Sequence, residues 1–311
     1  MNPDIYSTIT FPSLGFSWDP VRDISIGPLT FRIYGLIIAV GLMLAVIYGC
    51  KRAKQFGISV DDLTDGVLWI VPLAIVCARL YYCAFSWEDY KDNLVHILYI
   101  WKGGLAIYGG VIGAALGIVV FSLVKKIKVG AVLDITSLGF LIGQSIGRWG
   151  NFFNREAFGA ETESFLRMGL TNKFTGVVTY YHPTFLYESL WNIAGFVLLH
   201  FLSKKRKYDG QVALGYLAWY GLGRTFIEGL RMDSLYWGNF RVSQILAAVT
   251  CFLGVALLMF NAFRDHDPEN LQVNRYEASL AAMDAAEETP FNDTQEEELQ
   301  EEAPQEEGNH E

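Results

Sequence analysis

Seven long apolar segments dominate the chain and restrict it to one broad class of fold. Each is close to the ~20 residues that a helix needs to cross ~30 Å of hydrocarbon. They cover approximately residues 30–50, 66–86, 104–124, 131–149, 184–203, 212–229 and 242–263. Only 18% of the residues are charged, against about a quarter in a typical soluble domain. We therefore expect an all-α polytopic membrane protein with about seven transmembrane helices.

The basic residues predict how these helices are oriented. Every cluster of lysine and arginine follows an odd-numbered segment: Lys51, Arg52 and Lys54; Lys125, Lys126 and Lys128; Lys204, Lys205, Arg206 and Lys207; and Arg264. Loops on the cytoplasmic side of a membrane are enriched in lysine and arginine. The alternation predicts an external N-terminus and a cytoplasmic C-terminus.

Charge also divides the chain into two parts. Between Asp265 and Glu311 there are 16 acidic residues and one basic residue, Arg275. Such a composition, without an apolar run, is typical of disordered chain. We expect a membrane-embedded domain over residues 1–264 and an acidic, disordered cytoplasmic tail over residues 265–311. Residues 1–29, rich in proline, are expected to form an external loop or an interfacial segment.

Glycines recur every fourth residue in the third segment, at Gly109, Gly113 and Gly117. Small residues at this spacing let two membrane helices approach closely. This stripe predicts close helix packing rather than a ligand site.

The sequence lacks the motifs of several common catalytic and binding sites. It has no glycine-rich phosphate loop followed by Lys-Ser or Lys-Thr, no paired zinc-ligand spacing and no serine nucleophile elbow. The four cysteines lie in apolar segments without metal-ligand spacing, which favours buried structural thiols. We expect no metal, no cofactor and no nucleic-acid partner.

Polar residues crowd the end of the fourth segment, where Arg148, Asn151, Asn154 and Glu156 follow one another closely. Such groups are costly to remove from water near a bilayer, so the cluster suggests a functional site. On the expected topology it opens the external loop.

A second polar set lies on the sixth segment, where Tyr220, Arg224, Glu228 and Arg231 fall within one narrow arc of a helix. Its end shares the outer side of the membrane with Arg148. Two guanidinium groups there suit a phosphate, because their forked donors match its oxygens. The alternative is that Arg224 pairs with Glu228 and Arg148 with Glu156 only to neutralise one another.

Other outward-facing residues are candidates with ordinary alternatives. Tyr34 and Tyr108 begin the first and third segments, where tyrosine often serves as an interfacial anchor. His182 precedes the fifth segment, and Glu188 is a suspicious charge inside it. Arg79, within the second segment, needs an anion or a water-filled cavity.

The stretch Gly147-Arg148-x-Gly150-Asn151-Phe152-Phe153-Asn154-x-Glu156-x-x-Gly159 resembles the signature of bacterial phosphatidylglycerol–prolipoprotein diacylglyceryl transferases. Further stretches agree, and the resemblance covers about residues 1–264. It implies transfer of the diacylglyceryl group of phosphatidylglycerol to a lipobox cysteine in a prolipoprotein signal peptide, with release of glycerol phosphate. It also implies a bacterial plasma membrane, surrounding lipids as partners and no cofactor.

The resemblance also suggests roles for individual residues. It implies catalytic positions at Tyr34, Tyr108, Asn151, Glu156 and Arg224. It implies substrate-binding positions at Arg148, Asn154, Gly159, Glu228, Arg231 and His182. Tyr108 stands where the best-known members have histidine, which leaves two alternatives: a base activated by nearby arginines, or a group that only positions the lipid.

Two other classes of function compete with the transferase. A transporter of an anionic solute would line a pathway with Arg79, Arg148, Arg224 and Glu188, and it predicts internal repeats, none of which is visible in the sequence. A non-catalytic scaffold would use the polar groups only to join helices, which leaves the dense cluster at 147–159 unexplained.

Overall fold

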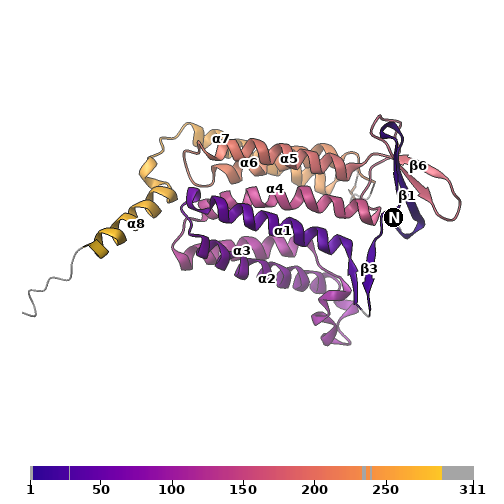
Figure 1. The fold of residues 1–311 in the computed structure, drawn as a ribbon, viewed down its shortest axis with the longest axis horizontal. Coiled ribbons are helices and arrows are strands. Elements are labelled where there is room, and N and C mark those ends of the chain that lie inside the picture. The colour runs from indigo at the N-terminus through magenta and orange to yellow at the C-terminus, as the bar shows by residue number, and fades with distance from the viewer. Residues whose placement is uncertain (1–2, 28, 233–235, 239, 289–311) are drawn as a thin grey trace, which may run out of the picture.

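Long helices form a bundle that carries β-strands at one end (Figure 1). The computed structural model describes residues 3–27, 29–232, 236–238 and 240–288. The helices are α1 (Ile33–Arg52), α2 (Val60–Phe85), α3 (Ile107–Lys125), α4 (Val129–Asn154), α5 (Thr184–Ser203), α6 (Gln211–Glu228), α7 (Val242–Ala262) and α8 (Gln272–Glu288).

Six helices in the described residues are long and apolar enough to cross a membrane: α1 with its continuation to Phe56, α2, α3, α4, α5 and α7. The seventh expected span coincides with α6, which is not among the six. The predicted bounds of α5 are confirmed, whereas α2 starts at Val60 instead of 66. The side chain of Ser59 caps its polar first turn, accepting a hydrogen bond from the Asp62 amide at 2.9 Å. Hydropathy alone does not detect that turn.

The glycine stripe of α3 packs against α2, as predicted. A Cβ atom on Gly109 would lie 2.5 Å from the carbonyl oxygen of Cys77. On Gly113 it would lie 2.6 Å from the Cβ of the same cysteine. Only glycine permits the two backbones to approach this closely.

An antiparallel sheet covers one end of the bundle, so the all-α expectation was incomplete. Its strands are β1 (Tyr6–Phe11), β2 (Phe16–Trp18), β5 (Met168–Asn172) and β6 (Val178–Tyr181), in the order β2-β1-β5-β6. Two hairpins join β3 (Asp23–Ile26) with β4 (Leu29–Arg32) and β7 (Tyr236–Trp237) with β8 (Phe240–Arg241). We call this region the sheet end. The strands are too short to stand out beside the long apolar helices.

The sheet packs directly on the polar end of α4. Ile9 and Phe11 of β1 are buried with Phe152 and Phe158. Arg155, which follows α4 in a left-handed conformation (φ 55°), donates hydrogen bonds to the carbonyl oxygens of Pro20 at 2.7 Å and Ser7, and pairs with Asp19. These contacts fix the last two turns of α4, which extend to Asn154 instead of ending near 149.

The opposite end of the bundle carries the C-terminal segment (Figure 1). Residues 265–288, expected to be disordered, contain a 3₁₀ turn (Pro268–Asn270) and α8. Composition predicted disorder because it does not show the contacts that the segment makes with loops of the bundle. Residues 289–311, the remainder of the acidic tail, lie outside the described residues. We call this region the tail end.

Candidate active site

One buried carboxylate, that of Glu188 in α5, forms ion pairs with three arginines. Arg148 Nη2 in α4 lies 2.5 Å from its Oε2 atom. Arg224 Nη1 in α6 lies 3.0 Å from Oε1, and Arg231 Nη1 lies 3.3 Å from the same oxygen. The two arginines that the sequence assigned to one cavity therefore share a single partner.

A second buried carboxylate, Glu228, orients Arg224 from the same helix. Arg224 Nη2 lies 2.6 Å from Glu228 Oε2, one helical turn away. Arg241 donates a hydrogen bond to the backbone carbonyl of Glu228. Arg231 lies beyond the end of α6 at Glu228, so its predicted place on the helical arc was wrong. The segment after the helix nevertheless returns its guanidinium to Glu188.

Three further polar side chains of the signature lie beside this group. The amide nitrogens of Asn151 and Asn154 both donate to Glu156 Oε1, at 3.0 and 3.1 Å. Arg148 Nη1 donates to the Asn151 amide oxygen at 3.4 Å. Glu156 therefore holds two asparagines, and the ion pair of Arg148 is with Glu188 instead of the Glu156 pairing considered from sequence.

Two tryptophans fix α5 and α6 in register. Trp191 Nε1 donates to the Trp219 carbonyl at 3.0 Å, and Trp219 Nε1 donates to the Trp191 carbonyl at 2.9 Å. Their rings stack with centroids 4.4 Å apart. This reciprocal pair lies one to two turns from Glu188 and Arg224 along the two helices, and so aligns their side chains.

Gly159 lets three segments of backbone meet next to the arginines. Its amide donates to the His182 carbonyl at 2.9 Å, and the Ala160 amide donates to the Leu230 carbonyl at 2.8 Å. A Cβ atom on Gly159 would lie 2.8 Å from both the His182 Cβ atom and the Leu230 oxygen. The close backbone approach at Gly159 is therefore with the segments of the protein that carry His182 and Arg231.

His182 contributes to this junction mainly through its backbone. Its Nδ1 atom lies 3.3 Å from the Tyr187 hydroxyl. Burial lowers the pKa of His182 below its usual value, which favours the neutral ring.

The two tyrosine candidates have different surroundings. Tyr34 in the first turn of α1 packs against Gly150, where a Cβ atom would lie 2.4 Å from its ring. Gly150 is between Arg148 and Asn151, so Tyr34 lies beside the site. Tyr108 in α3 has its ring centroid 6.5 Å from that of Tyr81 in α2. The ring of Tyr108 therefore contacts a side chain of α2.

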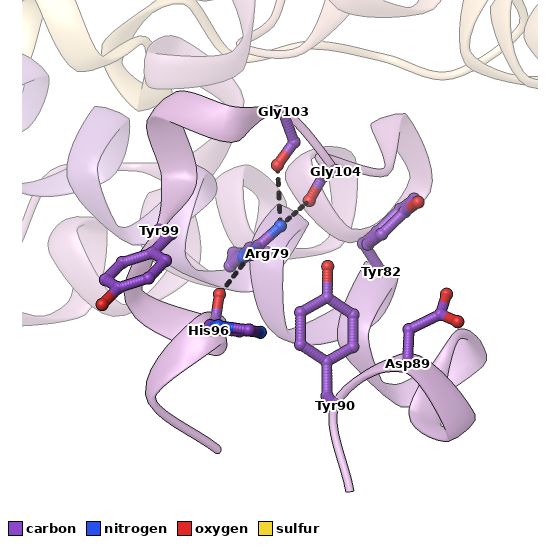
Figure 2. Close-up of a pocket in the computed structure, with 8 residues that line it drawn as sticks. All are labelled: Arg79, Tyr82, Asp89, Tyr90, His96, Tyr99, Gly103 and Gly104. Carbon is purple, nitrogen blue, oxygen red and sulfur yellow. Dashed lines mark hydrogen bonds between the residues drawn. The ribbon is translucent and has the colours of Figure 1, made fainter. Parts of the chain in front are cut away.

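Arg79 is held by backbone carbonyls and not by an anion. Its guanidinium donates to the carbonyl oxygens of Ile97 (2.8 Å), His96 (2.7 Å), Gly103 (2.7 Å) and Gly104 (2.9 Å). Figure 2 shows it at a small pocket with three tyrosines, His96 and Asp89 around it. The expected anion or water-filled cavity was not needed, since the loop between α2 and α3 wraps around the guanidinium.

The carboxylates and the arginines of this site differ in how much of their side chains is exposed. The side chains of Glu188 and Glu228 are only 5% and 2% exposed, whereas those of Arg148 and Arg224 are 24% and 18% exposed. The carboxylates are enclosed, and the arginine side chains keep accessible surface. We call Arg148, Arg224, Arg231, Glu188 and Glu228 the arginine–glutamate cluster. Its exposed, forked donors suit an oxyanion such as a phosphate.

Glu188 is the central residue that the sequence analysis left out of its site assignments. A charged side chain inside an apolar helix, directly after Tyr187, was the available signal. Its partners could not be found by spacing, because they lie on α4, on α6 and after α6.

Known proteins are similar to this chain over most of its length. Residues 23–260 match the family described as prolipoprotein diacylglyceryl transferase. A phosphatidylglycerol–prolipoprotein diacylglyceryl transferase from Listeria welshimeri is 42% identical over 256 residues, covering 80% of this chain and 92% of the relative. Proteins of the same name from Enterococcus faecalis and Streptococcus suis are 43% and 42% identical, each covering 80% of this chain and 95% of the relative. The chain belongs to the prolipoprotein diacylglyceryl transferase family.

Proposed function

We propose that the arginine–glutamate cluster is the place where this enzyme holds the phosphate of its lipid donor. By its family, the protein is a transferase of bacterial lipoprotein maturation. It moves the diacylglyceryl group of phosphatidylglycerol to the lipobox cysteine of a prolipoprotein. The products are a thioether and glycerol phosphate.

The sharing of Glu188 carries this proposal. Its two oxygens hold Arg148 and Arg224 at 2.5 and 3.0 Å, so guanidiniums from α4 and α6 are fixed next to each other. Each arginine uses part of its fork on a buried carboxylate and leaves part accessible. A phosphodiester between them would receive donors from two helices without either arginine having to move far.

In the transfer reaction these arginines have a catalytic role in addition to binding the donor. The cysteine sulfur forms a bond to the diacylglyceryl carbon while the bond from that carbon to the phosphate oxygen breaks. The electron pair stays on that oxygen, and the thiol proton is released to water. The departing phosphate thus gains negative charge as the reaction proceeds. Fixed guanidiniums therefore stabilise the transition state more than the bound donor.

The neighbouring side chains take supporting parts in the proposal. Asn151 and Asn154, which Glu156 orients, face the donor headgroup as hydrogen-bonding groups. Tyr34 packs beside them on Gly150. Tyr108 is 43% exposed on α3, and we assign it to the substrate path. Its contact with Tyr81, away from the arginines, favours a positioning role over that of a base activated by arginine.

We also propose that α6 crosses the membrane as a seventh span. Its 18 residues reach about 27 Å at 1.5 Å per residue, and it packs between α5 and α7 (Figure 1). Seven crossings with the basic clusters inside give an external N-terminus and a cytoplasmic C-terminus. The sheet end and the cluster then lie on the outer side of the bacterial plasma membrane.

The proposal is tested with purified protein, phosphatidylglycerol and a lipobox peptide. Mass spectrometry follows the diacylglyceryl adduct, and phosphatidylethanolamine replaces the donor as a control. Wild type and Arg167→Ala, an arginine change in the loop before β5, are expected to form the adduct at equal rates. Arg148→Ala and Arg224→Ala are each expected to lose it while remaining folded at the assay temperature. Full turnover in either cluster variant would show that the phosphate binds elsewhere.

A further inference from the structure

We propose that the segment after α7 is an intramolecular clamp, in which Gln272 holds three loops of the tail end together. Gln272 lies outside residues 23–260, over which the chain matches its family. The proposal therefore concerns a part of the molecule that family membership does not explain.

Gln272 hydrogen-bonds to each of three loops that join successive helices. Its Nε2 atom donates to the Gly57 carbonyl at 3.2 Å, in the connection from α1 to α2. Its Oε1 atom accepts from the Lys128 amide at 3.1 Å, in the connection from α3 to α4. Its backbone amide donates to Asp209 Oδ2 at 2.8 Å, in the connection from α5 to α6. One residue thus bridges three helix pairs.

The loops are shaped to receive this residue. Gly57 has φ +70°, and a Cβ atom there would lie 2.4 Å from the backbone carbonyl of Gln272. Only glycine allows that conformation and that approach together. Gln272 itself is 8% exposed, which is unusual for a glutamine at the start of a helix that otherwise points away from the bundle. A side chain buried in this way, with its amide group both donating and accepting hydrogen bonds, indicates a specific docking position.

Neighbouring contacts extend the interface on both sides of Gln272. The Lys128 ammonium donates to the Asn270 carbonyl and lies 3.7 Å from Asp209 Oδ2. The ring of Tyr208 stacks on that of His266, with centroids 4.5 Å apart. Hydrogen bonds and a ring contact therefore dock residues 266–272 on the loops that contain Lys128 and Asp209, and an ion pair joins these two loops to each other.

Loss of the clamp has a definite physical consequence. The Asp209 side chain is 5% exposed, so without the Gln272 amide a buried carboxylate loses a donor. The Lys128 amide and the Gly57 carbonyl lose their partner at the same time. Buried groups deprived of partners favour local opening. The three loops should then loosen together, while the arginine–glutamate cluster at the other end stays intact.

Hydrogen exchange of the full-length protein in detergent micelles tests the clamp. The variants are Gln272→Ala, the matched control Glu277→Ala on the exposed part of α8, and truncations after Glu288 and after Arg264. We expect peptides containing Gly57 and Lys128, the partners of the Gln272 side chain, to exchange about tenfold faster in Gln272→Ala. The peptide containing Asp209, whose partner is the Gln272 backbone amide, should join them only in the shorter truncation. The longer truncation and Glu277→Ala should exchange like wild type, and Gln272→Ala should keep wild-type transferase turnover.

The control variants decide between the clamp and a passive extension. Unchanged exchange in Gln272→Ala at both loops that the Gln272 side chain contacts would overturn the proposal. Faster exchange at only one of them, or an equal acceleration in Glu277→Ala, would overturn it as well. If truncation after Arg264 prevents folding, the comparison of Gln272→Ala with Glu277→Ala still gives the answer. The hydrogen-exchange result does not depend on whether Arg148→Ala loses turnover, so the clamp and the proposed phosphate site are tested separately.

Discussion

Arg79 and Arg148 both lie in apolar helices, yet the protein compensates their burial in two different ways. Arg79 is 5% exposed, and four backbone carbonyls surround its guanidinium. Arg148 is 24% exposed and is held by a carboxylate that it shares with Arg224 and Arg231. The first arrangement organises a loop, and the second presents charge to a ligand.

The comparison shows that an arginine in a membrane helix is not by itself a ligand site. What distinguishes the two is the partner and the remaining accessible surface. Backbone carbonyls take four of the five N–H donors of Arg79. Buried glutamates hold Arg148 and Arg224, whose side chains are more exposed than that of Arg79.

The largest effect is expected for Arg148→Ala. Removing one fixed cation from the departing phosphate should lower turnover about 1,000-fold, or about 4 kcal/mol of transition-state stabilisation. The melting temperature should fall only moderately, because the buried Glu188 loses one ion-pair partner but keeps Arg224 and Arg231. Turnover is measured by mass spectrometry of the lipidated peptide, with Arg167→Ala as the control. A melting temperature that falls as steeply as the activity would make Arg148 structural, like Arg79.

Arg79→Ala should show the reverse pattern. Four backbone carbonyl oxygens would lose their donor, which should destabilise the protein by about 3 kcal/mol. The expected result is a clear fall in melting temperature, with turnover per folded molecule close to wild type at low temperature. Normal stability combined with lost turnover would place Arg79 in the site and remove the contrast between the two arginines.

Glu188→Gln should weaken the site without dismantling the fold. The neutral amide keeps the shape of the side chain but no longer pairs with three guanidiniums. We expect turnover to fall about 30-fold, or about 2 kcal/mol. Glu161→Gln, an exposed change near β6, is the matched control. Wild-type turnover in Glu188→Gln would show that the arginines do not need their shared partner.

Gly159→Ala should disturb the site by displacing the backbone segments that meet at Gly159. The added Cβ atom would lie 2.8 Å from His182 and Leu230, so one of the three segments must shift. Overpacking of this kind costs about 1 kcal/mol or more. We expect a small fall in melting temperature and a several-fold fall in turnover, because Arg231 follows Leu230 directly. Gly176→Asn, at a left-handed position in an open turn (φ +72°), serves as a tolerant control; equal results for both would refute a special fit at Gly159.

The smallest effect concerns His182 and pH. Burial lowers its pKa in the folded protein, so the unfolded chain takes up a proton more readily. Stability from this group is complete above about pH 6.5, the unfolded pKa, and declines as pH falls below it. Melting temperatures between pH 7.5 and 5.5 should show a small decline that His182→Gln reduces. A larger decline in His182→Gln than in wild type would contradict the assignment.

The sequence predicted much of the helical frame because apolar length is a strong signal. All seven segments correspond to helices, and the packing role of Gly109 and Gly113 is confirmed. The sheet was missed because its strands are short and two of them lie far apart in the chain from the other two. The docking of residues 266–272 was missed because composition does not report contacts made by single residues such as Gln272.

The active site was also predicted only in part, because its residues come from several helices. Clustered polar residues and helical spacing correctly brought Arg148 and Arg224 together. Their common partner, Glu188, required knowledge of how α5 packs against α4 and α6. Arg79 was indistinguishable by residue type from a ligand-binding arginine, and only the path of the following loop shows that carbonyls satisfy it.

A structure of the protein with bound phosphatidylglycerol tests the central claim most directly. The lipid phosphate should lie with its oxygens about 3 Å from the guanidinium groups of both Arg148 and Arg224. Glu188 should still hold the two arginines from the opposite side. A phosphate bound at Arg79, or anywhere that leaves both cluster arginines without contact to it, would contradict the account.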